Sequence, residues 1–254
     1  INIPETRDVT GYRSRKYLNY DPTEAPGSDL TCVSGSIVFR ASEAYLNYIE
    51  ACYIRKKSID GDADKYWKAL RTRAGVDTDY TKTIAATDMD KEKSDWGAYS
   101  AGNMVDATLY NIRRERRNEL ASEGFRFNDV VRWRAMDQVS NYIVEGFNLW
   151  DEAYNDKVYT DPKPGEVTST GLIADGSSKA NVSNKSLSKY LRPYQIVNLS
   201  TNLVFNGYNW SKANYLSPMP YRQMQLASPT GDAATSNLYQ NPYWPSEPNA
   251  AAIE

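Results

Sequence analysis

The sequence contains no histidine and only two cysteines, Cys32 and Cys52, in 254 residues. Histidine is the usual proton acceptor in nucleophilic catalysis and a common zinc ligand, so its absence removes most routes to both kinds of site. We therefore predict no catalytic residue, no metal site and no cofactor. Cys52 lies on an apolar helical face and is predicted to be a buried thiol, while a disulfide to Cys32 is left open.

An excess of positive charge is also missing. Thirty Lys and Arg residues face 32 Asp and Glu residues, which gives a net charge of -2, and the clustered arginines are interleaved with glutamates. A protein that binds nucleic acid by neutralising phosphates needs a basic surface, so a nucleic-acid partner is not expected. The sequence has no apolar run of about 18 residues, and we expect no membrane-spanning helix.

Aromatic residues are present with a strong bias in type. The chain has 20 Tyr and 6 Trp against 5 Phe. Tyr and Trp rings carry a polar group and suit surfaces that are half exposed to water, as a carbohydrate-stacking surface is. The same rings also suit the rim of an ordinary core, and for any single ring both interpretations remain open.

The most specific pattern lies in residues 108–134. Leu109, Ile112, Arg116 and Leu120 share one face of a helix, so Arg116 is predicted to be half buried and to need a partner. Neighbouring faces carry the charged residues Arg113, Glu115, Arg117, Glu119 and Glu123. Such side chains can exchange ion pairs with whatever packs beside the helix, and we interpret them as structural rather than catalytic.

A second helix is predicted directly after this one. Gly124 suits the left-handed position that ends a helix, and Asn128 or Asp129 suits the N-cap of a helix through Trp133. The two helices would form a corner of the core.

Two earlier helices are predicted from apolar periodicity. In residues 37–57 the apolar stripe consists of Val38, Ala41, Tyr45, Ile49 and Cys52. A second helix is expected from an N-cap at Asp62 to Gly75. Two helices joined this closely are typical of a tetratricopeptide-type hairpin, although a single hairpin is a weak repeat signal.

These segments resemble the SusD/RagB family of outer-membrane nutrient-binding lipoproteins. The run IRRERRNELASEGFRFNDVVRW, from Ile112 to Trp133, is similar to the family pattern IxxERRxELxxEGxRxxDLxRW. Similar motifs follow the family order at Phe39 to Ala51, Ala69 to Gly75, Tyr215 to Pro220 (YLSPMP) and Gln240 to Trp244 (QNPYW). Tyr243 replaces a common glycine, so the local turn there is expected to differ. The residues carried over as the family's structural motif are Arg113, Glu115, Arg116, Arg117, Glu119, Glu123, Gly124, Arg126, Asp129, Arg132 and Trp133.

The resemblance implies a mainly α fold, with tetratricopeptide-like helical hairpins, long loops and a few short strands. Residues 1–254 would then be the C-terminal region of a longer family member, because the chain begins at Ile1 without an export signal or a lipid-acceptor cysteine near it. The membrane would be reached only through an N-terminal lipid anchor that this chain does not contain.

The resemblance also implies a function without catalysis. A member of this family binds oligosaccharides, or in some cases peptides, at the outer surface of the outer membrane and passes them to a SusC-type TonB-dependent transporter. Rings would stack on sugar faces while Asn, Asp and Arg side chains bind hydroxyl groups.

Ligand-binding residues are predicted from loop context alone. Trp96 and Tyr99 come first, because residues 76–103 form a long polar segment of the kind that is usually functional or disordered. The alternative role for Trp96 is to anchor the loop. Further candidates are, in order, Tyr208 with Trp210 and Trp150 with Tyr154.

Three other functions remain open. The chain could be a peptide-binding member of the same family, or a tetratricopeptide-type scaffold for a protein partner. A glycoside hydrolase would need two carboxylates in different environments, and no spacing in the sequence singles out such a pair.

Overall fold

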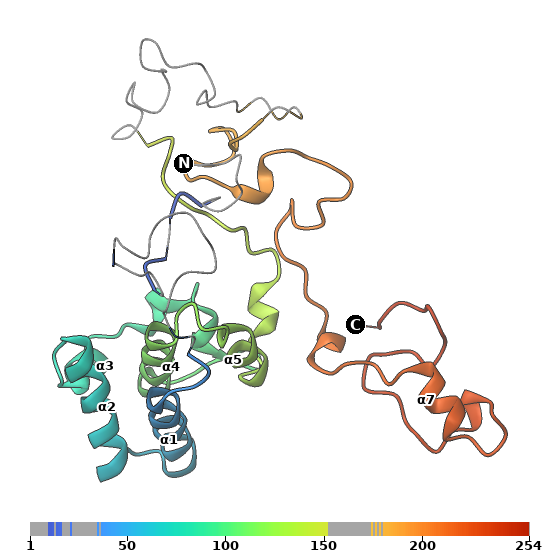
Figure 1. Cartoon of the computed structure of the whole chain (residues 1–254), viewed down its shortest axis with the longest axis horizontal. Helices are drawn as coiled ribbons and strands as arrows, with labels where there is room; N and C mark the ends of the chain where they lie inside the picture. The colour runs from blue at the N-terminus through green and yellow to red at the C-terminus, as the bar shows by residue number, and fades with distance from the viewer. Residues whose placement is uncertain are drawn as a thin grey trace. The chain divides into compact units, whose positions relative to one another are not determined.

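The computed structural model describes residues 10–12, 14–16, 21, 35, 37–151, 174, 176, 178 and 180–253. The chain is mainly helical, which confirms the predicted fold class (Figure 1). It divides into two compact units, which are described separately below. We call Tyr17–Gln138 with Trp210–Glu254 the helical unit, and Ile1–Lys16 with Val139–Asn209 the loop unit.

The regular elements of the described residues are mostly short. The α-helices are α1 (Ala41–Lys56), α2 (Gly61–Ala74), α3 (Tyr80–Ala85), α4 (Ala107–Glu119), α5 (Arg126–Arg132) and α7 (Tyr221–Leu226). The 3-10 helices are η2 (Met89–Glu92), η3 (Trp96–Ala98), η4 (Met136–Val139), η5 (Pro193–Gln195), η6 (Lys212–Tyr215) and η7 (Ala233–Thr235). Strands β1 (Tyr99–Ser100) and β2 (Asn103–Met104) pair antiparallel.

The predicted hairpin of α1 and α2 is confirmed. Asp60 rather than Asp62 caps α2, because its carboxylate accepts a hydrogen bond from the Ala63 amide at 2.9 Å. Gly75, at φ 70°, ends the helix in the left-handed conformation. α1 packs against both α2 and α4, and Leu46, Ile49 and Trp67 form the centre of the core between them.

The apolar stripe predicted for α1 is wrong at its N-terminal end. Val38 lies before the helix and is 83% exposed, whereas Leu46 is 1% exposed. The buried face of α1 also includes Glu50, which is 3% exposed. A carboxylate is therefore buried on a face that was predicted to be apolar. Arg132 of α5 binds this carboxylate, and this pairing allows Glu50 to be buried.

The face predicted for residues 108–134 is confirmed. Leu109, Ile112, Arg116 and Leu120 are all buried in or beside α4. Gly124 is left-handed at φ 82°, but α4 ends earlier, at Glu119. The N-cap prediction for α5 is also wrong, because Phe125 is the N-cap residue and makes no side-chain cap.

Residues 76–103 contain more structure than the predicted loop. They include α3, η2, η3 and the hairpin of β1 and β2. The two turn residues are Ala101, at φ 48°, and Gly102, at φ 80°. Positive φ at both positions is the geometry of a type I′ turn, whose twist matches that of the paired strands. The polar composition of this segment therefore reflects its exposure to solvent and not a lack of regular structure.

The two late proline-containing motifs bind each other. The side chain of Gln240 accepts a hydrogen bond from the Met219 amide at 2.7 Å and donates one to the Met219 carbonyl at 3.0 Å. The Trp244 indole donates to the Leu216 carbonyl at 2.7 Å. Tyr243, which replaces the common glycine, has φ 69°, a left-handed conformation that favours glycine. The turn is thus one that suits glycine, and it carries a tyrosine instead.

The loop unit has a small core of its own. Leu149, Val182 and Leu191 are at most 1% exposed and pack together. The Phe147 amide donates to the Thr10 carbonyl at 2.8 Å. A Cβ on the preceding Gly146 would lie 2.2 Å from that carbonyl oxygen, so this close approach requires glycine.

Cys52 is a free, buried thiol, and its sulfur lies 3.5 Å from the Ser58 carbonyl oxygen. Cys32 lies outside the described residues.

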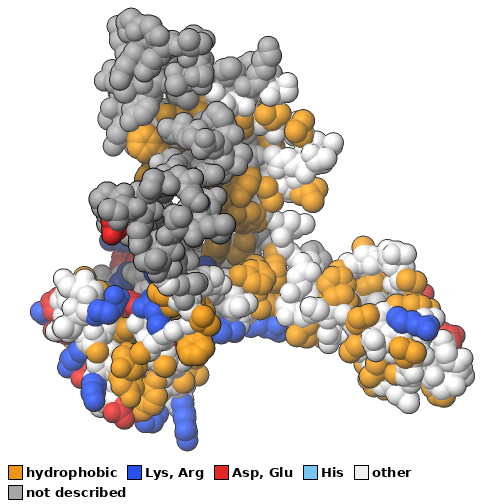
Figure 2. Space-filling model, viewed as in Figure 1, with side chains coloured by type: hydrophobic (Ala, Val, Ile, Leu, Met, Phe, Trp, Pro, Cys, Tyr) orange, Lys and Arg blue, Asp and Glu red, His pale blue; other side chains and the backbone are white. Residues whose placement is uncertain are grey.

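In the part of the chain that the structure describes, no helix is both long and apolar enough to cross a membrane. Basic, acidic and hydrophobic side chains are interspersed over the helices on the face drawn in Figure 2.

Candidate functional site

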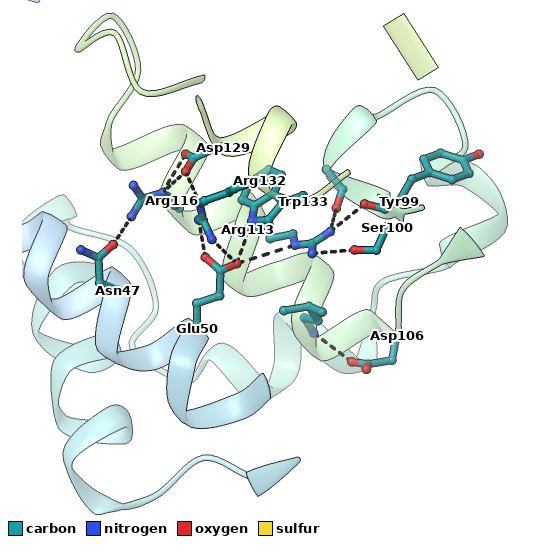
Figure 3. Close-up of polar contacts among 12 residues, drawn as sticks. Asn47, Glu50, Tyr99, Ser100, Asp106, Arg113, Arg116, Asp129, Arg132 and Trp133 are labelled. Atoms are coloured by element: carbon teal, nitrogen blue, oxygen red, sulfur yellow. Dashed lines mark hydrogen bonds and ion pairs between the residues drawn. The ribbon is translucent and has the colours of Figure 1, made fainter. Parts of the chain in front are cut away.

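The family-like motif on α4 and α5 is held by a buried ion pair (Figure 3). The guanidinium Nε of Arg116 lies 2.8 and 2.7 Å from the two carboxylate oxygens of Asp129, and each side chain is 5% exposed. Arg116 also donates to Asn47 of α1 at 2.7 Å. Asp129 is thus the partner that Arg116 requires, and it is engaged in this pair instead of capping α5.

Glu50 is a second buried centre of this network, and the sequence reading missed it. Arg132 donates to both of its carboxylate oxygens, at 2.9 and 2.6 Å, and the Trp133 indole donates at 2.7 Å (Figure 3). Glu50 belongs to the family-like run Phe39 to Ala51, and a glutamate beside Ile49 on an apolar face was the signal available. Its contacts join α1 to the end of α5.

Three glutamates of the motif connect α4 to other segments. Glu115 accepts hydrogen bonds from the Trp67 indole and from Arg71, both at 2.9 Å. Glu119 pairs with Arg40 and Arg73. Glu123 pairs with Arg40 at 2.6 Å.

The pKa of Glu119 reflects this pairing. Burial acts to raise it, but hydrogen bonds from Arg40, Ser42 and Arg73 and the charge of Arg40 lower it below the ordinary value. A glutamate held ionised between two arginines is a structural anchor rather than a proton donor.

Asp95 connects the motif to the predicted ligand-binding segment. Its carboxylate accepts hydrogen bonds from Arg117, from Arg126 at 3.1 Å and from the Tyr110 hydroxyl at 3.0 Å. It also accepts from the Gly97 amide at 2.9 Å. Burial acts to raise the pKa of Asp95, but this amide and the two arginines together lower it.

Arg113 holds the backbone of the same segment. It donates to the carbonyls of Gly97 at 3.1 Å and Tyr99 at 2.8 Å, and to the Ser100 hydroxyl at 2.8 Å (Figure 3). Its guanidinium lies 4.5 Å from the centre of the Trp133 ring. Burial lowers the pKa of Arg113 to about 10, so the group stays charged at neutral pH. Three arginines of the motif, Arg113, Arg117 and Arg126, therefore fix residues 95–100.

Trp96 and Tyr99 both belong to this fixed segment, which we call the clamped loop (residues 95–100). Both side chains are half buried. The Arg126 guanidinium lies 5.9 Å from the centre of the Trp96 ring. The Tyr99 hydroxyl donates to the Lys93 carbonyl at 3.0 Å. Both rings are thus held by the protein, with part of each surface left to solvent.

Tyr208 and Trp210, the second predicted pair, fall in different units. Tyr208 lies 6.1 Å from Tyr142 and 6.3 Å from Tyr194, measured between ring centres. Trp210 packs edge-on against Tyr215 at 5.2 Å. Each ring therefore belongs to its own aromatic cluster.

Trp150 packs against the core of the loop unit, and its indole donates to the Ser183 carbonyl at 2.9 Å. These contacts give it an anchoring role in that unit. Its predicted companion Tyr154 lies outside the described residues.

Two open pockets are lined by described residues of the helical unit. One, of about 490 Å³, lies over the turn between α4 and α5 and includes Leu120, Phe125 and Phe127. The other, of about 400 Å³, lies beside the turn of the β1–β2 hairpin, and sequence reasoning did not find it. Its lining includes Arg134, Lys212 and Tyr243, which are far apart in the sequence.

In the described residues, no group of three or more Cys, Asp or Glu side chains is placed to hold a metal ion.

Comparison with known protein families identifies a match. The SusD family model matches residues 1–244, a range that includes the α4–α5 motif and both late motifs. No curated protein and no solved structure matches the chain.

Proposed function

The chain belongs to the SusD family, and we propose that it binds oligosaccharides at the cell surface and passes them to a SusC-type TonB-dependent transporter. Proteins of this family bind nutrients and are associated with the outer membrane as lipoproteins. The chain acts as a binding protein in this proposal and catalyses no reaction.

The clamped loop is the observation that carries the proposal. Arg113 donates hydrogen bonds to two of its backbone carbonyls, and the Asp95 carboxylate forms ion pairs with Arg117 and Arg126. A loop that is already ordered loses little conformational entropy when a ligand binds, so its rings are available in a fixed position. The family motif thus supports a surface that presents Trp96 and Tyr99.

The chemistry of these rings suits sugars. The apolar face of a pyranose packs on an aromatic ring, while its hydroxyl groups need polar partners at the edge. Tyr99 and Trp96 supply half-exposed rings, and Ser100 and Asn103 follow directly on the hairpin. A mostly preformed surface of this kind needs only modest affinity when a transporter lies next to it.

Affinity electrophoresis tests this binding. We expect the full-length protein to be retarded in native gels that contain one or more polysaccharides of a broad panel. Trp96→Ala or Tyr99→Ala should weaken that binding about five- to thirtyfold, because loss of a half-buried ring costs about 1 to 2 kcal/mol.

Two variants serve as controls. Tyr99→Phe keeps the ring and should still bind. Tyr239→Ala removes a ring that is 90% exposed elsewhere, and should also bind normally. If Trp96→Ala and Tyr99→Ala are both retarded as strongly as the wild type, the ligand binds elsewhere on the protein. No retardation by any polymer, together with binding of peptides, would replace the oligosaccharide with a peptide ligand.

The transporter partnership needs its own measurement. We expect the full-length protein, extracted from the outer membrane in mild detergent, to co-purify with a TonB-dependent transporter. Co-purification should be unaffected by Trp96→Ala, since that ring is proposed to contact ligand. A protein that is recovered alone under conditions that preserve membrane complexes would contradict this part of the proposal.

A further inference from the structure

The pocket beside the β1–β2 hairpin, which we call the hairpin pocket, is built from four separate segments of the helical unit. Its lining consists of Ala101, Gly102, Arg134, Asp137, Lys212, Ala213, Tyr215, Leu216, Pro242 and Tyr243. It begins at the turn that directly follows Tyr99 and Ser100, so it adjoins the clamped loop along the chain. Leu216 and Tyr243 are 49% and 47% exposed, and the pocket is therefore open to solvent.

The charged side chains of this pocket form no ion pair with one another or with any other residue that the structure describes. Arg134, Lys212 and Asp137 take part in no ion pair among the described residues. This differs from the adjoining motif, where the side chains of Arg116, Arg117 and Arg132 each contact a carboxylate. Two cationic side chains and one carboxylate give the lining of the pocket a net positive charge.

The Arg134 side chain has a defined support. Its guanidinium carbon lies 4.5 Å from the centre of the Tyr215 ring. The Tyr215 hydroxyl in turn accepts a hydrogen bond from the Met136 amide at 2.9 Å, and Trp210 packs edge-on against the same ring. A guanidinium stacked on a ring keeps its N–H groups free to bind an anion.

The backbone around the pocket adopts a rarely populated conformation. Ala101, Arg134 and Tyr243 have φ of 48°, 56° and 69°, in the left-handed region that L side chains rarely adopt. The Ala101 amide donates to the Arg134 carbonyl at 2.8 Å, which links two of these residues. Strained residues of this kind concentrate at binding sites, where the surrounding structure holds them in place.

Tyr243 adds a specific reason to expect a ligand. Its backbone conformation, with φ at 69°, is one that suits glycine. A tyrosine there is strained, makes no ring stack among the described residues and leaves half of its surface exposed at the pocket. The exposed part of Tyr243 is therefore available to a ligand at the pocket wall.

We propose that the hairpin pocket binds an acidic sugar residue, one that carries a carboxylate or a sulfate ester. The proposal rests on the function proposed above and names the kind of oligosaccharide. Arg134 and Lys212 bind the anionic group, Tyr243 covers the sugar face, and Asp137 accepts hydrogen bonds from hydroxyl groups. A neutral sugar would leave both cations without a partner.

The test compares charged and uncharged forms of the same ligand. The full-length protein is titrated calorimetrically with oligogalacturonate and its methyl ester, and with a sulfated galactan oligosaccharide and its desulfated form. We expect at least one acidic form to bind about tenfold more tightly than its uncharged counterpart, with a preference that falls as salt is raised. A preference in the first pair identifies the carboxylate as the recognised group, and a preference in the second identifies the sulfate ester.

Variants locate the effect. Arg134→Gln and Lys212→Gln should each reduce the preference for the acidic form about threefold, while Arg222→Gln, which changes an exposed arginine on α7, should leave it unchanged. Tyr243→Gly should weaken the acidic and the uncharged form alike. It relieves the left-handed strain, so its melting temperature should not fall, and lost binding cannot be ascribed to unfolding.

Each remaining outcome overturns the inference. Equal affinity for the acidic and uncharged forms would do so, as would a preference that survives both glutamine variants. Binding of neutral polysaccharides alone would overturn this inference and leave the proposed function standing. Absence of binding to any glycan in the panel would overturn both.

Discussion

Arg116 and Asp129 are buried in the helical unit, where each side chain is only 5% exposed. An ionised group in such a place is stable only with a partner, since transfer of an isolated charge from water to a protein interior is very costly. The same reasoning applies to Glu50, whose carboxylate accepts hydrogen bonds from Arg132 and Trp133. These pairs fix how α1, α4 and α5 meet.

Removal of one partner from the central pair should therefore destabilise the fold. Asp129→Ala leaves Arg116 buried without its carboxylate, and we expect the free energy of unfolding to fall by about 3 to 5 kcal/mol in urea denaturation. Lys68→Ala, which breaks an exposed pair with Asp64, is the matched control and should change stability little. A loss below about 1 kcal/mol for Asp129→Ala would contradict a structural role for the pair.

Single residues also show which side-chain roles can be predicted from the sequence and which cannot. Arg116 was predictable because a guanidinium on an apolar face must be neutralised. The sequence predicts either Asn128 or Asp129 as the N-cap of α5, since from sequence alone a carboxylate near a helix start suits that role equally well. The choice between the two roles depends on the position of another helix, which the local sequence does not contain.

At the scale of elements, the clamped loop depends on Asp95. This residue joins the loop to α4 through Arg117 and to α5 through Arg126. Its pKa is lowered in the folded protein, so its contribution to stability is present above the ordinary value of about 3.9 and is lost as the pH falls through the lowered value.

Asp95→Asn should loosen the clamped loop around Trp96 at neutral pH, although Arg113 still holds Tyr99 and Ser100. The fluorescence of Trp96, obtained by difference from Trp96→Phe, should stay constant in the wild type from pH 7 to about pH 4 and change below that. In Asp95→Asn it should already be altered at pH 7, because the two arginines have lost their anion. Identical spectra for the variant and the wild type at pH 7 would show that Asp95 does not hold the loop.

Helices with regular periodicity were predictable, and the segments between them were less so. The α1–α2 hairpin and the buried face of α4 follow from apolar spacing and from Gly75. Asn206 and Gly207 form a dipeptide that favours a hairpin turn, but no strands flank it in the described residues. Gly207 instead allows Asn141 to approach, since a Cβ there would lie 2.6 Å from the Asn141 carbonyl carbon. Contacts between distant segments decide such cases.

At the scale of the whole molecule, the family match includes the motif, and three arginines of this motif hold the clamped loop. The SusD family model covers residues 1–244, and the described part of that range contains both the motif and the hairpin pocket. The identity of the ligand follows from neither the motif nor the fold, because Trp96, Lys212 and Tyr243 lie in connecting segments outside the long helices. That the chain is the C-terminal region of a longer member stays a prediction.

Hydrogen exchange on the full-length protein tests the central claim most directly, which is that the clamped loop and the adjoining hairpin bind an oligosaccharide. The polysaccharide that retards the protein in gels supplies the oligosaccharide for this measurement. We predict slower amide exchange in residues 95–104 when it is added, with no change around η7 at residues 233–235. Binding that leaves exchange in residues 95–104 unchanged and slows it only elsewhere would contradict the account.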